Sequence, residues 1–407
     1  MTDTRAGTPG PRLVMALGVT QIISWGSIFY AFALLADDLA AAVGAEKTTV
    51  VGAFSVALLI AGLASSAVGG LIDRHGGRRL MSGGSLLAAG GLAALTQVQT
   101  LPQLYLVWAV LGVSMAATLY DPAFAVLVQA FRDGHRKAIT GVTLFGGFAS
   151  TVFWPLTQAL IERFGWQGTL WVLAALQLLV CLPLHARVLP GPPARSEAVP
   201  AQRSRPPALR TVYRDPSFYL LCLAFTGSSL VFSALSVHLI PLLHLKGMSL
   251  QQAAWIGAMI GPMQVAGRLL EYAFLAKASP SRVGLVAMSL LPASLLLLAA
   301  LTTQQGGFLL FALLYGAGNG IMTIVRGAIP VQLYGREHYG AVNGAMAGPA
   351  LIAKAAGPWV ASLILAALTQ PVHLVWVLAG VAALSAGLFS LAAPLAARRA
   401  RARAEAV

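Results

Sequence analysis

Long apolar stretches constrain this chain more than any other feature. Of its 407 residues, 57% are hydrophobic and only 10% are charged, and most charges fall in short segments between apolar runs. A helix needs roughly 20 apolar residues to cross a hydrocarbon core of about 30 Å. We place the predicted spans at 13–37, 48–72, 80–98, 102–131, 138–161, 167–189, 216–244, 250–276, 283–302, 307–334, 339–367 and 371–397. The sequence therefore predicts an all-α integral membrane protein with twelve transmembrane helices.

The basic residues follow the predicted topology. Of the 27 Lys and Arg, 21 lie on one side of the membrane, three lie within spans, and Lys47, Arg163 and Lys246 lie on the other side. This bias is the positive-inside rule, and it places both chain ends in the cytoplasm of a cell (inner) membrane protein. The net charge of +14 therefore reflects topology, and we expect no nucleic-acid partner.

The connecting segments divide the chain into two halves. Segment 190–214 is rich in Pro, Arg and Ser, which predicts a flexible cytoplasmic linker. The predicted parts are a cytoplasmic tail 1–12, a six-helix bundle 13–189, the linker 190–214, a six-helix bundle 215–397 and a basic tail 398–407. We expect no cleaved signal peptide at the start of the chain, and we expect the basic tail to contact anionic lipid.

The two halves resemble each other. A shift of 203 residues lays Ala138–Gly141 over Ala341–Gly344, and a shift of 198 lays Gly69–Asp73 over Gly267–Glu271. Two matches within five residues of one spacing indicate a duplication. Parallel repeats of six helices, with a substrate site near the bilayer midplane between them, are a known plan of transporters. The sequence therefore predicts two pseudo-symmetric six-helix bundles.

The loop between the second and third spans carries a recognisable motif. Gly69-Gly70-Leu71-Ile72-Asp73-Arg74-His75-Gly76-Gly77-Arg78-Arg79 resembles the signature loop of the major facilitator superfamily, Gly-x-Leu-Ala-Asp-Arg-x-Gly-Arg-Lys. The chain departs from this pattern at Ile72 and Gly77. It keeps Asp73, Arg74, Gly76 and Arg78. Together with the twelve spans and the central linker, this resemblance covers the whole chain.

Independently of this resemblance, the loop predicts a tight turn beside a cluster of charged residues. Gly76 and Gly77 permit a tight turn with positive φ. Asp73 ends a helix and can bridge to the neighbouring bundle. The resemblance implies that Asp73, Arg74 and Arg78 gate the cytoplasmic side without touching substrate. A turn with charges that set the topology is a simpler interpretation, and both interpretations can hold.

Three cations interrupt the apolar spans of the second half: Arg268, Arg326 and Lys354. A charge at the bilayer centre costs about 2.5–3.5 kcal/mol on insertion scales, so it persists where it faces a bundle interior or a watery cavity. Few carboxylates lie within the spans to pair with these cations. The pattern therefore predicts a site for an anion.

Arg268 and Lys354 carry the narrower resemblance. An arginine in the eighth span with a lysine in the eleventh resembles the oxalate–formate antiporter branch, and a buried arginine in the eighth span also recurs in monocarboxylate transporters. The resemblance implies that Arg268 and Lys354 clamp the carboxylates of a small organic anion. For Arg268, an internal ion pair with Glu271, one turn later, is the alternative. For Lys354, Gly357-Pro358 offers a local break whose carbonyls could solvate the ammonium.

The remaining candidates concern gating, protons and the pocket lining. The repeat places Asp121 and Arg326 at equivalent levels of opposite halves, which predicts a bridge between them, either a gate or a static pair. Asp121 and Glu271 are the candidates for proton coupling, because burial can raise a carboxylate pKa. His238 and His244 are weaker candidates. Tyr30 and Trp154 are candidate pocket residues.

These features favour a secondary transporter of a mono- or dicarboxylate, driven by protons or by anion exchange. Efflux of drugs or other amphipathic compounds is the alternative. An enzyme is not expected, since the spans contain no catalytic motif. Cys181 and Cys222 fall in spans and indicate neither a disulfide nor a metal site, so no metal or cofactor is predicted. We expect a monomer.

Overall fold

The protein is helical throughout the part of the chain that its computed structural model describes. The described residues are 10–131, 133–191, 209–275, 277–301, 305–368, 370 and 372–405. None of them lies in a strand. The chain divides into two compact units, of which unit 1 comprises residues 1–197 and 336–345 and unit 2 comprises residues 198–335 and 346–407. Most of the predicted linker, residues 192–208, lies outside the described residues.

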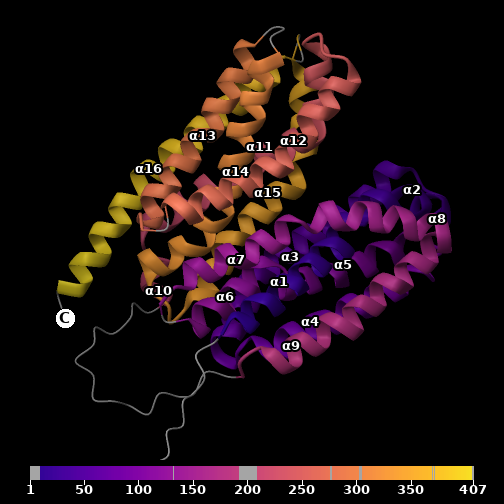
Figure 1. Ribbon diagram of the computed structural model, residues 1–407, viewed down its shortest axis with the longest axis horizontal. Coiled ribbons are helices and arrows are strands. Elements are labelled where there is room, and N and C mark those ends of the chain that lie inside the picture. Colours follow the sequence, from indigo (N-terminus) through magenta and orange to yellow (C-terminus); the bar gives the residue numbers. More distant parts are fainter. Residues whose placement is uncertain are drawn as a thin grey trace, which may run out of the picture. The chain divides into compact units, whose positions relative to one another are not determined.

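Unit 1 holds the helices of the first half, drawn from indigo to magenta in Figure 1. They are α1 (Pro11–Trp25), η1 (Gly26–Tyr30), α2 (Phe32–Val43), α3 (Lys47–His75), α4 (Gly77–Leu95), α5 (Leu101–Thr118), α6 (Tyr120–Ala130), α7 (His135–Gly147), α8 (Ala149–Leu176), η2 (Gln177–Cys181) and α9 (Leu182–Val188). The segments η1 and η2 are π-helices, single wide turns that often occur at functional sites.

Unit 2 holds the remaining helices, with one of them shared. They are α10 (Leu209–Val212), α11 (Pro216–Leu245), α12 (Leu250–Leu270), η3 (Glu271–Leu275), α13 (Pro280–Ala300), α14 (Gln305–Tyr334), α15 (Tyr339–Ala367) and α16 (His373–Glu405). Helix α15 belongs to unit 1 up to Ala345 and to unit 2 from Met346 onward. The core of unit 2 is apolar and includes the fully buried Phe308 and Phe311 of α14.

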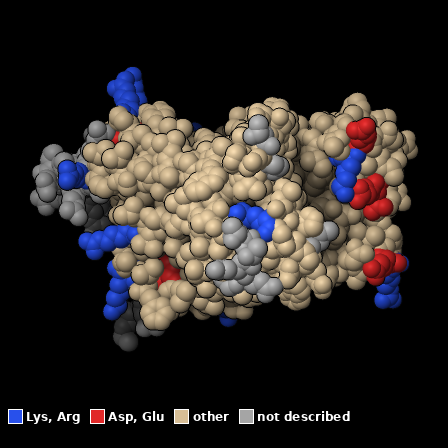
Figure 2. All heavy atoms as spheres, turned by 90° about the horizontal axis from the view of Figure 1, so that it is seen from above, with Lys and Arg blue, Asp and Glu red and all other residues tan. Residues whose placement is uncertain are grey.

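The helices fit the predicted twelve spans. Nine helical stretches in the described part of the chain are long and apolar enough to cross a membrane. The longest, His135–Val188, contains two predicted spans that meet at Gly165, where a φ of 69° interrupts the helix. Helix α4, and α12 with η3, supply the other two. Wide areas of the face in Figure 2 carry no Lys, Arg, Asp or Glu, as expected of membrane-crossing helices.

The turn of the signature loop depends on two glycines in different ways. Gly76 separates α3 from α4 with φ 74°, a conformation that favours glycine. Gly77 is already helical, so the prediction of positive φ there was wrong. Its role is spatial instead, because a Cβ at Gly77 would lie 2.0 Å from Cγ2 of Val126.

Candidate functional site

Lys354 lies halfway along α15, and its side chain is half-buried. Pro358 follows four residues later and has no N–H, so the Lys354 carbonyl lacks its usual helical donor. The Ser233 hydroxyl of α11 donates a hydrogen bond to this carbonyl. Gly357 lets the helices approach, since a Cβ there would lie 2.8 Å from Cβ of Ser233. Helix α11 therefore supports the backbone at Lys354.

The side chains of His238 and Ser362 continue this contact between α11 and α15. The Nε2 atom of His238 lies 3.1 Å from the Pro358 carbonyl and 3.4 Å from the hydroxyl of Ser362. Ser362 also donates to the Pro358 carbonyl, over 3.0 Å. We call the residues Ser233, His238, Lys354, Pro358 and Ser362 the α11–α15 seam.

Arg268 and Glu271 are both removed from solvent, with exposed fractions of 4% and 1%. They lie one turn apart, where α12 continues into the π-helix η3. Glycines bring α12 against α14, because a Cβ at Gly267 would lie 2.6 Å from Cα of Ala317. Buried ionised groups require partners. A direct ion pair between Arg268 and Glu271 stays a prediction.

Arg326 lies on α14 beside an aromatic ring. Its guanidinium carbon is 5.9 Å from the centre of the Phe225 ring, within the range of a cation–π contact. Phe225 is buried on α11. Pro330 follows Arg326 by four residues, the same spacing as between Lys354 and Pro358.

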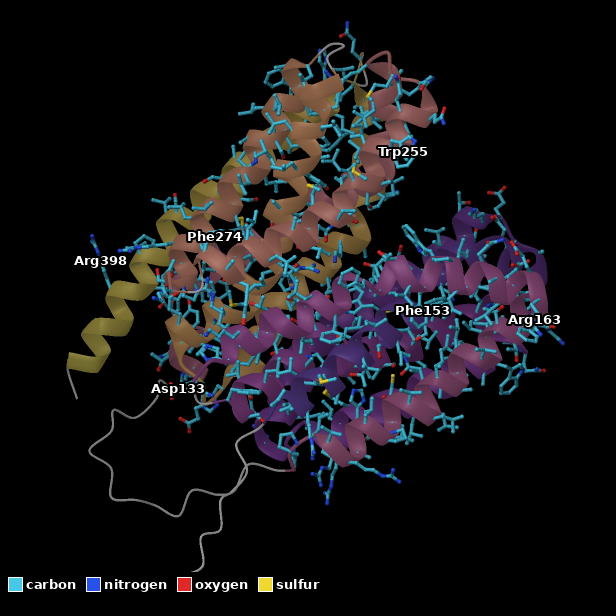
Figure 3. The ribbon with its side chains drawn as sticks, in the orientation of Figure 1. Asp133, Phe153, Arg163, Trp255, Phe274 and Arg398 are labelled. Atoms are coloured by element: carbon cyan, nitrogen blue, oxygen red, sulfur yellow. The ribbon has the colours of Figure 1, made fainter. Side chains whose placement is uncertain are left out.

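The predicted pocket aromatics contact each other in unit 1. The ring centres of Tyr30 and Trp154 are 6.0 Å apart and the rings meet at 83°, an edge-to-face arrangement. The ring of Trp25 lies 6.2 Å from that of Tyr30. Beside them, Phe153 points into the helices of unit 1 (Figure 3). Gly26 in η1 leaves room for it, since a Cβ there would lie 2.0 Å from the Phe153 ring.

The candidate substrate residues are thus divided between the units. Arg268, Arg326 and Lys354 belong to unit 2, whereas Tyr30 and Trp154 belong to unit 1. Their joint action at one substrate stays a prediction.

Residues 336–345, which we call the docking segment, belong to unit 1 and contain the first turns of α15. The Asp73 carboxylate accepts hydrogen bonds from the backbone N–H groups of Gly340 and Ala341, each over 2.9 Å. A carboxylate at a helix N-terminus satisfies free N–H groups and complements the helix dipole. Gln129 donates to the Ile72 carbonyl over 3.1 Å, one residue before Asp73. Asp73 therefore caps α15 from a different helix.

Further contacts hold the docking segment against unit 1. The Arg336 guanidinium donates to the carbonyls of Val128 and Phe131 at the end of α6. The Ser65 hydroxyl donates to the Gly344 carbonyl over 2.7 Å. The backbones touch at Gly69, where a Cβ would lie 1.8 Å from the carbonyl oxygen of Gly340.

Asp121 has a partner in the docking segment that the sequence did not reveal. The side-chain amide of Asn343 donates to Asp121 over 3.0 Å. Asp121 belongs to unit 1 and Arg326 to unit 2, so the bridge between them stays a prediction. The sequence signal for Asn343 was the repeat, which aligns it with Thr140, so that both halves carry a polar residue at this position of an apolar run.

Several loop cations cap the C-terminal ends of helices. Arg78 donates to the Leu189 carbonyl at the end of α9, over 2.7 Å, whereas Arg74 is exposed. Lys246 donates to the carbonyls of Ala299 and Leu301 at the end of α13, over 3.1 and 2.7 Å. Burial lowers the pKa of Lys246. Cations suit these positions because the last carbonyls of a helix are unpaired and carry partial negative charge.

The described residues contain no cluster of metal-binding side chains. No group of three or more His, Cys, Asp or Glu among them could hold a metal ion. Cys181 and Cys222 are free and buried.

Known proteins share both the sequence pattern and the fold. The pattern of the Major Facilitator Superfamily matches residues 14–304. Monocarboxylate transporter 12 of Homo sapiens is 28% identical over 216 residues, 46% of this chain and 42% of that protein. Monocarboxylate transporter 4 of Gallus gallus is 25% identical over 324 residues, 76% of this chain and 67% of that protein. The chain thus spans less than half of the first relative.

Two further proteins widen the comparison. The fujikurins efflux protein of Gibberella fujikuroi is 26% identical over 273 residues, 65% of this chain and 56% of that protein. The crystal structure of the human organic anion transporter MFSD10 superposes with a TM-score of 0.70 at 18% identity, covering 93% of this chain and 99% of that one. The chain belongs to the major facilitator superfamily and is a multi-pass membrane protein.

Proposed function

We propose that the protein moves a small organic anion, a mono- or dicarboxylate, across the cell (inner) membrane by alternating access. The observation that carries this proposal is Lys354, a half-buried cation halfway along an apolar helix whose backbone is supported by Ser233. The match to monocarboxylate transporters supports the same class of solute.

The second half carries charged side chains within its apolar helices. Arg268 is buried one turn from the equally buried Glu271, and Arg326 and Lys354 are half-buried on apolar helices. An arriving carboxylate neutralises part of this charge, and arginine can bind it with two parallel hydrogen bonds. Binding of the anion therefore lowers the electrostatic penalty of closing the site.

Gating is assigned to the docking segment in this proposal. Asp73 binds the first turn of α15, and Arg336 binds the end of α6. Arg78, in the signature loop that follows Asp73, binds the end of α9. A switch of conformation would break these hydrogen bonds. Asp121 and Glu271 are the proposed proton carriers if transport is proton-coupled, while anion exchange needs neither.

Counterflow in proteoliposomes tests the proposal. Purified protein is reconstituted, loaded with one unlabelled acid and offered the same acid in labelled form. The panel contains formate, acetate, L-lactate, pyruvate, oxalate and succinate. Saturable uptake of one acid, inhibited by an excess of the unlabelled acid, is the expected result. Absence of uptake across the panel, in vesicles with verified protein insertion, contradicts it.

Efflux of an amphipathic compound is the second candidate. The similarity to the fujikurins efflux protein supports it, as does Trp154, an exposed aromatic ring beside Tyr30. Transport of a hydrophobic dye, with no uptake of the acids, would favour this candidate.

A further inference from the structure

His238 continues the α11–α15 seam beyond the turn that holds Lys354. Ser233 and His238 are five residues apart on α11, an axial rise of about 7.5 Å. Pro358 and Ser362, which lie near the His238 ring, follow Lys354 by one and two turns of α15. His238 and Lys354 are both half-buried, and Ser362 is exposed. The seam is therefore a row of polar groups that leads along two helices to Lys354.

The hydrogen bond to Pro358 defines the state of the imidazole ring. A carbonyl can only accept, so Nε2 of His238 carries a hydrogen. The other nitrogen, Nδ1, has no hydrogen-bond partner among the described residues. Protonation of His238 at Nδ1 would thus add a positive charge and a second donor without breaking the bond to Pro358.

The helices that contact α11 carry several charged or titratable side chains. Helices α12 and α16 pack against α11, and Tyr315 of α14 donates to its Phe232 carbonyl. Besides His238, the charged or titratable side chains of α11, α12, α14, α15 and α16 between residues 216 and 396 are Tyr219, Cys222, His244, Arg268, Tyr315, Arg326, Tyr334, Tyr339, Lys354 and His373, and Glu271 directly follows α12. The one carboxylate in this set, Glu271, lies one turn from Arg268, and neither α11 nor α15 carries a carboxylate. We therefore expect a bound anion to be the counter-ion of a protonated His238.

We propose that His238 is a second anion-binding group, which strengthens binding at Lys354 when it is protonated. The inference rests on the proposed function. A carboxylate bound beside Lys354 favours the proton on His238, and by reciprocity the proton favours the carboxylate. The affinity for the anion should therefore rise as the pH falls from about 8 to about 5.5.

The test measures the pH dependence of KM by counterflow, with the same pH on both sides of the vesicle. Pyruvate and oxalate are the probes, because both stay almost entirely ionised over this range. For the wild type, KM should be at least about fivefold lower at about pH 5.5 than at about pH 8. His238→Gln keeps an N–H donor for Pro358 but cannot become charged. Its KM should not fall on acidification.

His238→Phe supplies the structural control, since it loses both the charge and the hydrogen bond. Thermal unfolding should show wild-type stability for His238→Gln and a lower midpoint for His238→Phe. A wild-type KM that does not change with pH, or a His238→Gln variant with the full pH dependence, overturns the assignment of His238 alone. Failure of the wild type to take up either probe overturns the assignment together with the proposed function.

Discussion

The hydroxyl of Ser233 donates a hydrogen bond to the backbone carbonyl of Lys354, joining α11 to α15 at the central cation of the second half. The reason lies in the sequence of α15, because Pro358 cannot supply the N–H that this carbonyl would otherwise accept. A helix that crosses a membrane cannot leave such a carbonyl to water. The residue that supports Lys354 is therefore found on another helix.

A double-mutant cycle tests whether Pro358 is the reason that the Lys354 carbonyl needs Ser233. Ser233→Ala should lower the free energy of unfolding by about 1–3 kcal/mol, since it leaves a buried carbonyl without its donor. Pro358→Ala restores an N–H four residues after Lys354. In that background the loss from Ser233→Ala should shrink to less than half, as measured by thermal unfolding in detergent. Equal losses in the two backgrounds would argue against the proline as the cause.

A pair of neighbouring glycines tests the docking segment. Gly69→Ala places a Cβ 1.8 Å from the Gly340 carbonyl, whereas Gly70→Ala places one 3.7 Å from Cβ of Ala341, an ordinary contact. Overpacking of this kind costs about 1–3 kcal/mol. Hydrogen exchange of residues 336–345 should accelerate in Gly69→Ala and stay unchanged in Gly70→Ala. The same rate in both variants would contradict the close approach of the two backbones.

Arg336 allows a separate test of the same segment. Arg336→Gln removes the charged donor to the end of α6 and should cost about 1.5–3 kcal/mol of stability, as for other hydrogen bonds to charged groups. Arg282→Gln is the matched control, because Arg282 is an exposed cation near the start of α13. Both variants are compared by thermal unfolding. If Arg282→Gln is as destabilised as Arg336→Gln, loss of positive charge rather than loss of the cap explains the effect.

The architecture follows from the sequence because its causes are local or periodic. Apolar runs fix the spans, the distribution of Lys and Arg fixes the predicted topology, and Gly76 marks the turn of the signature loop. The three π-helices of the described residues, η1, η2 and η3, left no comparable signal. The role of Gly77 was misjudged because a Cβ at this position would collide with Val126, a residue on a different helix.

The site was only partly predictable for the same reason. Lys354 stood out as a charge in an apolar span, but Ser233 lies 121 residues away and looks like any small polar residue of a helix. Arg336 was counted among the charges that set topology, and its contact with α6 needs the folded chain. Asn343 and Asp121 likewise meet across 222 positions of the sequence.

The measurement that bears most directly on the account is counterflow by Lys354→Gln. This substitution removes the charge but keeps the backbone carbonyl that Ser233 holds. Loss of one partner of a buried charge pair costs about 2–5 kcal/mol, so uptake at low acid concentration should fall at least about 30-fold. Lys246→Gln is the control, because Lys246 caps α13 and has no part in the proposed site. Normal uptake by Lys354→Gln, with correct folding and insertion, would contradict the proposal that Lys354 binds the anion.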